Sequence, residues 1–342
     1  CAHVQLVDVI DSKILFHDKF TYMPSKNEKL LNHFNDYIKY AKKYLKSPGG
    51  ITIDIGSNDG LFLSLVKEKT NNIVLGIDPA ELPANHAIKN GINTWVEFFS
   101  CDTVLKIKDQ YGCVDWVSAN NVFAHNDNLI GMLSNIKSIM SDDGIFTFEI
   151  SYLLDIVQKG LIGTVFHEHL SYHSITSLIP FLNSVGMQLI DAVRVDSQGG
   201  ALIGIVKKGI KNNISNNIGY LLQLEKKNNL DTQVGLLNFR EKIRSDKEKI
   251  INIIENIMPN CRLVGFGASR SSNLLVEYYD LGDKLKCIID DNQTKKGKYF
   301  PNYNIPIIGQ EEIHEYMPNC VIILAWIHTE KLKYVINRLL PN

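Results

Sequence analysis

The stretch "IDIGSNDGLFL", Ile53 to Leu63, joins a short apolar run to a glycine-containing turn and then to the first residues of a helical segment. A short apolar run that ends at a glycine is typical of a buried strand. Gly56 and Gly60 allow the backbone to approach a ligand closely, and the helix start supplies N–H groups without partners. The stretch therefore predicts a strand, turn and helix that bind a small ligand.

Outward from this stretch, strand-like runs alternate with helix-length segments such as Leu61 to Lys69 and Asn128 to Met140, which predicts a parallel sheet covered by helices. Two closely spaced strands follow later and predict a hairpin. We therefore expect an α/β fold with a Rossmann-like seven-stranded sheet. The predicted strands are "ITIDIG", "NIVLGIDP", "INTWVEFF", "CVDWVSANNV", "GIFTFEIS", "MQLIDAVRV" and "GGALIGIV".

The second strand ends in "GIDP", so Asp78 is placed where a carboxylate can accept hydrogen bonds from both hydroxyls of a ribose. The glycine loop matches neither GxGxxG nor a triphosphate-binding GK[ST], and alone it could be an ordinary turn. Loop and acid together predict an adenosine ligand. Nicotinamide dinucleotides and S-adenosylmethionine both fit, but the closing hairpin and Asp54 favour S-adenosylmethionine.

The fourth strand ends in the polar stretch "SANNVFAH". Ligands of open α/β sheets bind at the carboxyl ends of the strands, so we expect these polar side chains to face the cofactor. The predicted cofactor-binding residues are Asp54, Gly56, Ser57, Asn58, Gly60, Asp78, Pro79, Phe99, Asn120, Asn121 and His125.

Composition and charge argue against several classes of partner. The chain has 342 residues, 45% of them hydrophobic and 21% charged, and a net charge of -1. Its basic residues are spread out, which argues against nucleic acid and anionic membranes, and no apolar run reaches the ~20 residues of a membrane span. The six cysteines form no CxxC motif. We expect a two-domain cytoplasmic protein, most simply a monomer, with a small-molecule partner.

Beyond the sheet, the pattern predicts one amphipathic helix over Ser25 to Leu45 and a polar helical segment after Lys207. A second α/β unit begins with "CRLVGFGAS". Pro180 is tolerated in the first turn of a helix, so the helix before Gly186 should begin near Ser177 and leave "HEHLSYHS" on the preceding loop.

The segment "VFHEHLSYHS", Val165 to Ser174, concentrates three histidines and a glutamate. A metal site, an acid/base centre and a polar surface turn are all compatible with it. The histidine spacing suits an extended chain for one pair and a helix for the other, so no single backbone state aligns all three as ligands. Acid/base chemistry is the preferred interpretation, with histidine as a base near neutral pH.

These stretches together resemble the S-adenosylmethionine-dependent C-methyltransferases that act on nucleotide-linked deoxyketosugars. The resemblance covers nearly the whole chain, and the matching stretches follow the family's order. They are "CAHVQL", "DIGSNDG", "GIDPA", "NNVFAH", "FHEHLSYHS", "QGGALI", "GFGAS" and "DDNQTKKGKYFPNYNIPI".

The resemblance implies a class I methyltransferase domain, a C-terminal α/β domain that helps to enclose the sugar nucleotide, and an N-terminal zinc module that is largely absent. Cys1 would be the last of four zinc ligands, so zinc is expected only if a longer chain supplies the missing cysteines. The expected domains are residues 1–46 (module remnant and helix), 47–208 (methyltransferase), 209–258 (helical connector) and 259–342 (C-terminal α/β).

By motif position, His169 would be the base, with Glu168 orienting it and His167 and Tyr172 beside them. The chain has Phe166 where the family has a tyrosine serving the ketone oxygen, so Tyr172, Tyr152 or His173 would take that role. It also has "QGGALI" for the family's "HGGSLR". The expected substrate-binding residues are Glu149, Tyr152, Phe166, Gly199, Gly200, Arg270, Lys298 and Tyr299.

The expected activity is C-methylation of a nucleotide-activated keto-deoxysugar, with S-adenosylhomocysteine as the second product. Two alternatives stay open. An oxygen or nitrogen methyltransferase on a related sugar nucleotide would need less of a base, and a non-catalytic sugar-nucleotide-binding homologue would also tolerate the substitutions at Phe166 and in "QGGALI".

Overall fold

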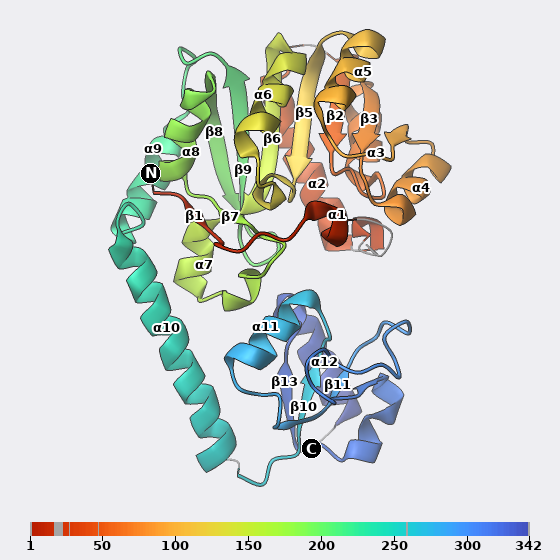
Figure 1. The fold of residues 1–342 in the computed structure, drawn as a ribbon, viewed down its shortest axis with the longest axis vertical. Helices are drawn as coiled ribbons and strands as arrows, with labels where there is room; N and C mark the ends of the chain where they lie inside the picture. The colour runs from red at the N-terminus through yellow and green to blue at the C-terminus, as the bar shows by residue number, and fades with distance from the viewer. Residues whose placement is uncertain (1, 17–22, 27, 47, 258, 341–342) are drawn as a thin grey trace. The chain divides into compact units, whose positions relative to one another are not determined.

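The computed structural model describes residues 2–16, 23–26, 28–46, 48–257 and 259–340. The chain forms two compact units (Figure 1). The first consists of Cys1–Asp155 and His167–Gly235, and the second of Ile156–Phe166 and Leu236–Asn342. The short segment Ile156–Phe166 thus belongs to the second unit although its sequence neighbours belong to the first, which no sequence pattern indicated.

The first unit contains the predicted seven-stranded sheet, in the order β4-β3-β2-β5-β6-β9-β8. Strands β4, β3, β2, β5 and β6 are parallel, and β9 and β8 form the antiparallel hairpin. The order of connection reverses at β2, which lies between β3 and β5, and ligands of such sheets bind at this point. The strands are β2 Ile51–Ile55, β3 Ile73–Ile77, β4 Thr94–Trp95, β5 Val114–Asn120, β6 Met140–Ser151, β8 Met187–Val195 and β9 Ala201–Lys208.

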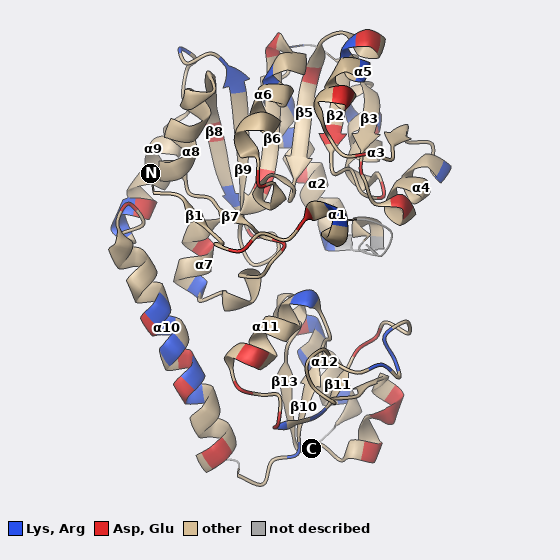
Figure 2. Ribbon diagram, viewed as in Figure 1, with Lys and Arg blue, Asp and Glu red and all other residues tan. Residues whose placement is uncertain are grey.

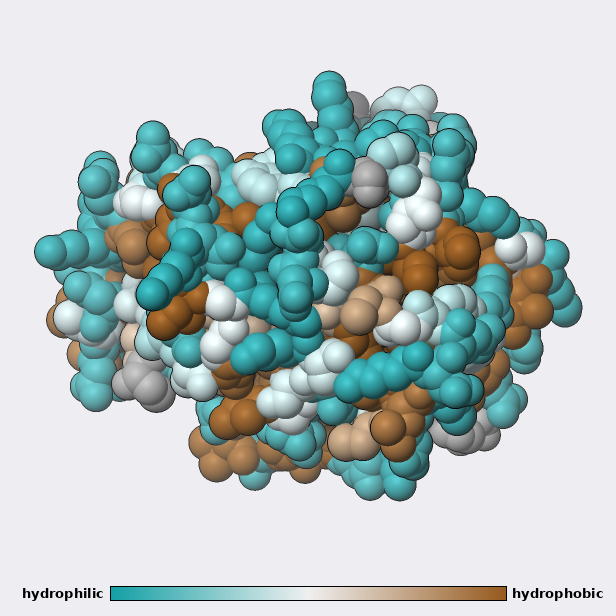
Figure 3. Space-filling model, turned by 90° about the horizontal axis from the view of Figure 1, so that it is seen from above, coloured by the Kyte–Doolittle hydropathy of each residue, from teal (hydrophilic) through white to brown (hydrophobic). Residues whose placement is uncertain are grey.

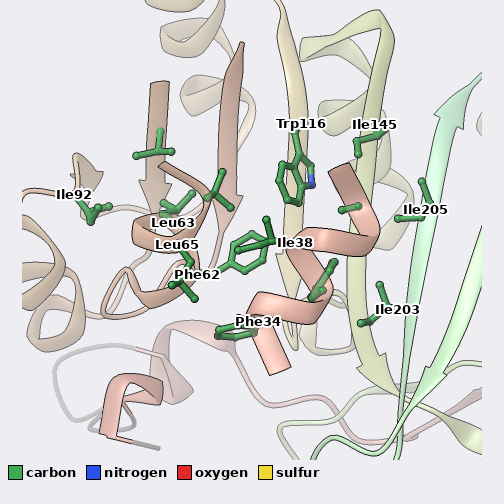
Figure 4. Packing of buried hydrophobic residues seen from close by; sticks show 14 of the residues in the cluster. Phe34, Ile38, Phe62, Leu63, Leu65, Ile92, Trp116, Ile145, Ile203 and Ile205 are labelled. Carbon is green, nitrogen blue, oxygen red and sulfur yellow. The ribbon is translucent and has the colours of Figure 1, made fainter. Parts of the chain in front are cut away.

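Helices cover both faces of this sheet (Figure 1). Helix α2 packs on one face, where Phe34 and Ile38 belong to one hydrophobic cluster with Trp116 of β5 and Ile203 of β9 (Figure 4). The predicted helix over Ser25 to Leu45 is an α-helix only over Glu28–Ala41, with 3-10 turns at Pro24–Lys26 and Lys42–Tyr44. The remaining helices of the unit are α1 Ser12–Leu15, α3 Leu61–Thr70, α4 Glu81–Lys89, α5 Cys101–Tyr111, η3 Phe123–His125, α6 Leu129–Ile139, α8 Ile175–Ser184 and α9 Asn216–Lys227. Helix α7, Leu153–Lys159, begins in this unit, and its residues from Ile156 onward belong to the second.

The prediction for α8 was wrong about its start. The helix begins at Ile175, because Ser174 and Ser177 form a reciprocal capping box, and Pro180 therefore lies inside the helix instead of in its first turn. The segment before it is also not all loop. Ser171–Tyr172 forms strand β7, which pairs with β1, Val4–Gln5, in an antiparallel two-stranded sheet.

A buried carboxylate from α9 fixes the start of α8. Glu225 accepts hydrogen bonds from the backbone N–H groups of Ile175 (2.6 Å) and Thr176 (2.9 Å) and from the Tyr152 hydroxyl (2.7 Å). Glu225 and Tyr152 are both fully buried. Burial and the Glu225 carboxylate raise the pKa of Tyr152. Glu225 therefore joins α9 to the start of α8 and to Tyr152, and the expected role of Tyr152 in substrate binding stays a prediction.

The second unit contains a four-stranded parallel sheet in the order β12-β11-β10-β13, as expected for a second α/β unit. Its hydrophobic core includes Ile162 of the segment Ile156–Phe166 and Ile243 of α10. The elements are η4 Ile162–Thr164, α10 Gln233–Asn252, η5 Ile253–Ile257, β10 Leu263–Phe266, α11 Arg270–Tyr278, β11 Leu285–Ile289, β12 Ile307–Ile308, η6 Gln310–Tyr316, β13 Cys320–Ile323, η7 Trp326–His328 and α12 Thr329–Leu339.

Charged residues of both signs are interspersed over the described surface. Along α10, basic and acidic residues alternate (Figure 2), and Arg244 lies 2.9 Å from Glu241 on the preceding turn. Figure 3 shows a mostly hydrophilic face with scattered apolar patches. Among the described residues, no helix has the length and apolar character needed to cross a bilayer.

We predict that Glu225→Ala destabilises the first unit by at least about 3 kcal/mol, because four donors around it, including the Thr176 hydroxyl, lose their acceptor. Urea denaturation followed by circular dichroism measures the loss, and amide hydrogen exchange should accelerate at the start of α8. Glu97→Ala, which removes a partly exposed partner of Lys106, is the control and should cost at most about 1 kcal/mol. Equal effects of the two substitutions would contradict this role for Glu225.

Candidate functional site

The loop between β2 and α3 lies at the point where the sheet order reverses. Gly56 has φ 72° there, and its N–H donates to the carbonyl of Ile77 at the end of β3 (2.7 Å). A Cβ atom on Gly56 would lie 2.2 Å from Cγ2 of Val122. Only glycine satisfies both the left-handed backbone and the contact with Val122, so the turn has the tight form that the sequence predicted.

Asp78 holds this loop in place with both carboxylate oxygens. Oδ2 accepts the N–H of Asn58 (2.7 Å) and Oδ1 accepts the N–H of Ala80 (2.8 Å). A carboxylate accepts about four hydrogen bonds, so capacity for ribose hydroxyls remains. Burial raises the pKa of Asp78, although the two backbone N–H groups oppose the shift. The structure thus brings together Asn58, Asp78 and Pro79, three of the predicted cofactor-binding residues.

Asp54 lies near the end of β2, two residues before Gly56 of the loop. Its Oδ1 accepts a hydrogen bond from the Ser118 hydroxyl (2.6 Å) and a longer one from the Asn120 amide (3.4 Å). Burial raises the pKa of Asp54 to about 8, and Ser118 only partly opposes this shift. Asp54 and Asn120 are therefore joined in one buried polar group, in which Ser118 is a member that the sequence reasoning missed.

Several polar atoms around the loop are buried and have no hydrogen-bond partner among the described residues. They are Oγ of Ser57, Oδ1 of Asp59 and Oδ1 of Asn120. The other oxygen of Asp59 accepts the N–H of Ser25 (3.0 Å). Buried polar atoms without partners are costly, so this set fits a ligand rich in hydroxyl and amino groups such as S-adenosylmethionine. Asp59 is not among the cofactor-binding residues predicted from the sequence, although it lies within "GSNDG" of the same loop.

The histidine-rich segment reaches the same edge of the sheet. His125, in the turn η3 after β5, has its ring stacked on the ring of His169, with centroids 5.1 Å apart and planes at 15°. Phe16 also stacks on His125, at 5.5 Å and 4°. The predicted base therefore lies beside a predicted cofactor-binding residue. Phe16 was not predicted, because no sequence pattern brings it to this position.

The other polar residues of this segment occupy different environments. His167 is exposed, whereas Glu168 and Tyr172 are buried, and Phe166 belongs to the second unit. His173 is stacked on Phe123 at 5.1 Å, and burial lowers its pKa to about 3. Within the described residues, no three His, Cys, Asp or Glu side chains are arranged to hold a metal ion. Cys1 lies outside those residues.

The remaining predicted residues are distributed over both units. Glu149 lies near the end of β6, paired with Asn120 of β5. Phe99 precedes α5, Asn121 follows β5 with φ 54°, and Gly199 and Gly200 precede β9. A Cβ atom on Gly200 would lie 2.2 Å from Cγ of Asp155, so this glycine serves close packing. Arg270 begins α11, and Lys298 and the exposed Tyr299 lie between β11 and β12, all in the second unit.

The second unit repeats the loop geometry of the first. The N–H of Gly267 donates to the carbonyl of Ile289 (2.7 Å), and the N–H of Ala268 donates to Oδ2 of Asp290 (2.8 Å). The second unit differs in the partner of this aspartate. Nζ of Lys295 lies 3.0 Å from Oδ2 of Asp290 and also donates a hydrogen bond to the Ala268 carbonyl. The two units therefore share this backbone arrangement, but in the second unit the aspartate forms an ion pair with a lysine.

Comparison with known proteins agrees with this geometry. Residues 25–192 match the family model described as a methyltransferase domain, and residues 196–338 match the model described as a C-methyltransferase C-terminal domain. The chain belongs to the S-adenosylmethionine-dependent C-methyltransferases. It is 24% identical over 336 residues to C-methyltransferase NovU of Streptomyces niveus, covering 97% of this chain and 80% of that protein.

Solved structures similar to this C-methyltransferase include two other methyltransferases. One is magnesium protoporphyrin IX methyltransferase of Synechocystis PCC 6803, with TM-score 0.41 and 14% identity over 58% of this chain and 92% of that one. The other is the 1,6-didemethyltoxoflavin-N1-methyltransferase of Burkholderia thailandensis, with TM-score 0.40 and 14% identity over 54% of this chain and 80% of that one.

We predict that Asp78→Asn weakens binding of S-adenosylhomocysteine, measured by calorimetry, by about 1.5–3 kcal/mol, because a charge-assisted acceptor for the ribose is lost. Asp102→Asn, on the exposed start of α5, is the matched control and should leave the affinity unchanged. An unchanged affinity in a folded Asp78→Asn variant would remove Asp78 from the cofactor site.

Asp54 predicts a distinct pH dependence of stability. Its folded-state pKa is raised from 3.8 to about 8, so the folded state retains a proton that the unfolded chain releases. This contribution to stability is lost as pH rises between those values. Relative to the wild type, Asp54→Asn should therefore melt at increasingly higher temperature as pH rises from about 5 to about 8. A difference in melting temperature that does not change with pH would show that Asp54 is ionised throughout.

Proposed function

We propose that this methyltransferase methylates carbon next to the ketone of a nucleotide-linked keto-deoxysugar, with His169 as the base. The observation that supports this most is the stacking of His169 on His125, at the carboxyl edge where Asp54, Asp78 and the glycine loop also lie. The C-methyltransferase family model over residues 196–338 supports transfer to carbon.

Carbon chemistry explains why a base is needed here. An sp³ carbon has no lone pair until a proton is removed, and an adjacent ketone makes removal feasible because the charge is delocalised onto oxygen as an enolate. Histidine accepts a proton near neutral pH. When bound, S-adenosylmethionine supplies the electrophilic methyl group. The chain must hold the acceptor carbon in line with it, which is the role we propose for this edge of the sheet.

In this proposal, Glu168 orients the His169 ring, and His167 lies on the exposed side of the same segment. The enolate oxygen needs a hydrogen-bond donor. Tyr152 is fully buried and donates to Glu225, and His173 is packed against Phe123. Tyr172 on β7 is then the residue we propose as the donor in place of the family's tyrosine at Phe166.

We further propose that Arg270, Lys298 and Tyr299 of the second unit contact the nucleotide diphosphate, since guanidinium groups bind phosphates by paired hydrogen bonds. The proposed setting is the cytoplasm, where sugar nucleotides are made and used.

We predict that the wild type, given a dTDP-linked keto-deoxyglucose in heavy water with S-adenosylhomocysteine, exchanges deuterium at the carbon that becomes methylated. His169→Asn keeps the size of the side chain but cannot take a proton near neutral pH, so exchange should disappear while S-adenosylhomocysteine still binds. Methyl transfer should fall by about 100-fold or more. Mass spectrometry and NMR of the sugar measure both.

His86→Asn is the control for this experiment, because His86 is an exposed histidine of α4 that contacts Asn90. It should leave exchange and methylation unchanged. Near wild-type methylation by His169→Asn would remove the histidine-rich segment from catalysis. An oxygen- or nitrogen-methylated product would refute the carbon chemistry, and a wild type without turnover on any sugar nucleotide would favour a binding role.

A further inference from the structure

A second histidine and carboxylate pair lies at the same edge of the sheet, outside the histidine-rich segment. Glu149 lies near the end of β6 with 1% of its surface exposed, and its Oε2 lies 2.6 Å from Nε2 of His33 on α2. Its other oxygen, Oε1, is buried and has no hydrogen-bond partner among the described residues. A buried carboxylate oxygen without a partner is costly, so this atom has the properties of a group that meets a ligand.

Strand register shows which way Glu149 faces. Glu149 is paired with Asn120 of β5 on one side and with Ile203 of β9 on the other. Side chains directly opposed across strands lie on the same face of a sheet. Ile203 packs against α2 (Figure 4), so Glu149 faces α2 as well, in agreement with its contact to His33.

The strand order also places Glu149 relative to the cofactor loop. The loop follows β2, Asn120 lies on the adjacent β5, and Glu149 lies one strand further, on β6. At a spacing of about 4.8 Å between strands, Glu149 is roughly 10 Å across the sheet from the end of β2. It therefore lies on the far side of Asn120 from the loop after β2, a position that suits the methyl acceptor beside the cofactor.

His33 supplies the charge that balances this carboxylate. Ile203, directly opposite Glu149 on β9, is apolar and carries none. Burial alone would lower the pKa of His33, but the hydrogen bond and charge of Glu149 outweigh it, so the pKa is raised. The ion pair fixes Oε2 and leaves Oε1 as the free acceptor.

We propose that Glu149 determines specificity for the methyl acceptor, with Oε1 accepting a hydrogen bond from an amine or hydroxyl of the sugar, and that His33 positions it. This inference rests on the proposed function. Oδ1 of Asn120, on the paired strand, is a second buried acceptor without a partner among the described residues. Because Oδ1 of Asn120 belongs to the polar group beside the cofactor loop, Oε1 of Glu149 is the acceptor that we assign to the sugar.

The test measures binding and turnover separately. The probe is a dTDP-linked keto-deoxyglucose, titrated by calorimetry into protein saturated with S-adenosylhomocysteine. Glu149→Gln keeps the shape of the side chain but replaces one oxygen by a donor, so the affinity for the sugar nucleotide should fall roughly tenfold or more. The affinity for S-adenosylhomocysteine should change less than about twofold. Glu97→Gln, at a partly exposed glutamate, is the control.

His33→Asn tests the positioning role. It should raise KM for the sugar nucleotide and leave kcat near the wild-type value. The double variant with Glu149→Gln should have the same KM as Glu149→Gln alone, because both changes remove the same interaction. His86→Asn is the matched control. An additive double variant, or a lower kcat with unchanged KM, would show that His33 acts elsewhere.

The outcomes separate this inference from the function on which it rests. If folded Glu149→Gln binds the sugar nucleotide like the wild type, the inference falls and the proposed function stands. If its affinity for S-adenosylhomocysteine falls instead, Oε1 serves the ammonium group of the cofactor and the assignment to the acceptor is wrong. If the wild type neither binds nor methylates the sugar nucleotide, both fall.

Discussion

The carboxylate of Asp78 is the interaction on which the rest of the site depends. By accepting the N–H groups of Asn58 and Ala80, it joins the loop after β2 to the end of β3. This contact sets the loop at the point where the sheet order reverses, and it leaves Gly56 with a backbone conformation and a contact that exclude a side chain. In the second unit, Asp290 likewise accepts a backbone N–H, that of Ala268, but it also forms an ion pair with Lys295. The same backbone arrangement therefore occurs in both units, and the aspartate has a lysine partner in the second.

Three separate elements bring the histidine-rich segment to the edge defined by Asp78. Strand β1 pairs with β7, the capping box of Ser174 fixes the start of α8, and Glu225 of α9 binds the first N–H groups of that helix. These contacts hold the chain directly after His169, and the His169 ring, which is not part of a regular element, stacks on His125. Preorganisation of this kind is what a proton-transfer site requires.

Polar side chains lie near the ends of three neighbouring strands of the sheet. Asp54 at β2, Asn120 at β5 and Glu149 at β6 face α2, and each has a different partner, respectively Ser118, Asp54 and His33. Two of the three, Asn120 and Glu149, keep an oxygen that no described residue bonds. The sheet therefore presents acceptors in order from the cofactor loop outward, and this order is consistent with a donor and an acceptor bound side by side.

The sequence by itself determined the sheet and the cofactor loop. Strand runs, the closing hairpin, Gly56 and Asp78 are local signals, because strand periodicity and left-handed turns depend on residues close in the chain. The predicted start of α8 near Ser177 was wrong, because the serine capping box outweighed the expected cost of an internal proline. No local pattern indicated the bond from Tyr152 to Glu225, which lies far along the chain. Only the tertiary structure decided that Phe16, His125 and His169 form one stack and that His33 pairs with Glu149. These contacts join residues far apart in sequence, and their geometry follows from packing of α2 and the histidine-rich segment on the sheet, which no local pattern encodes.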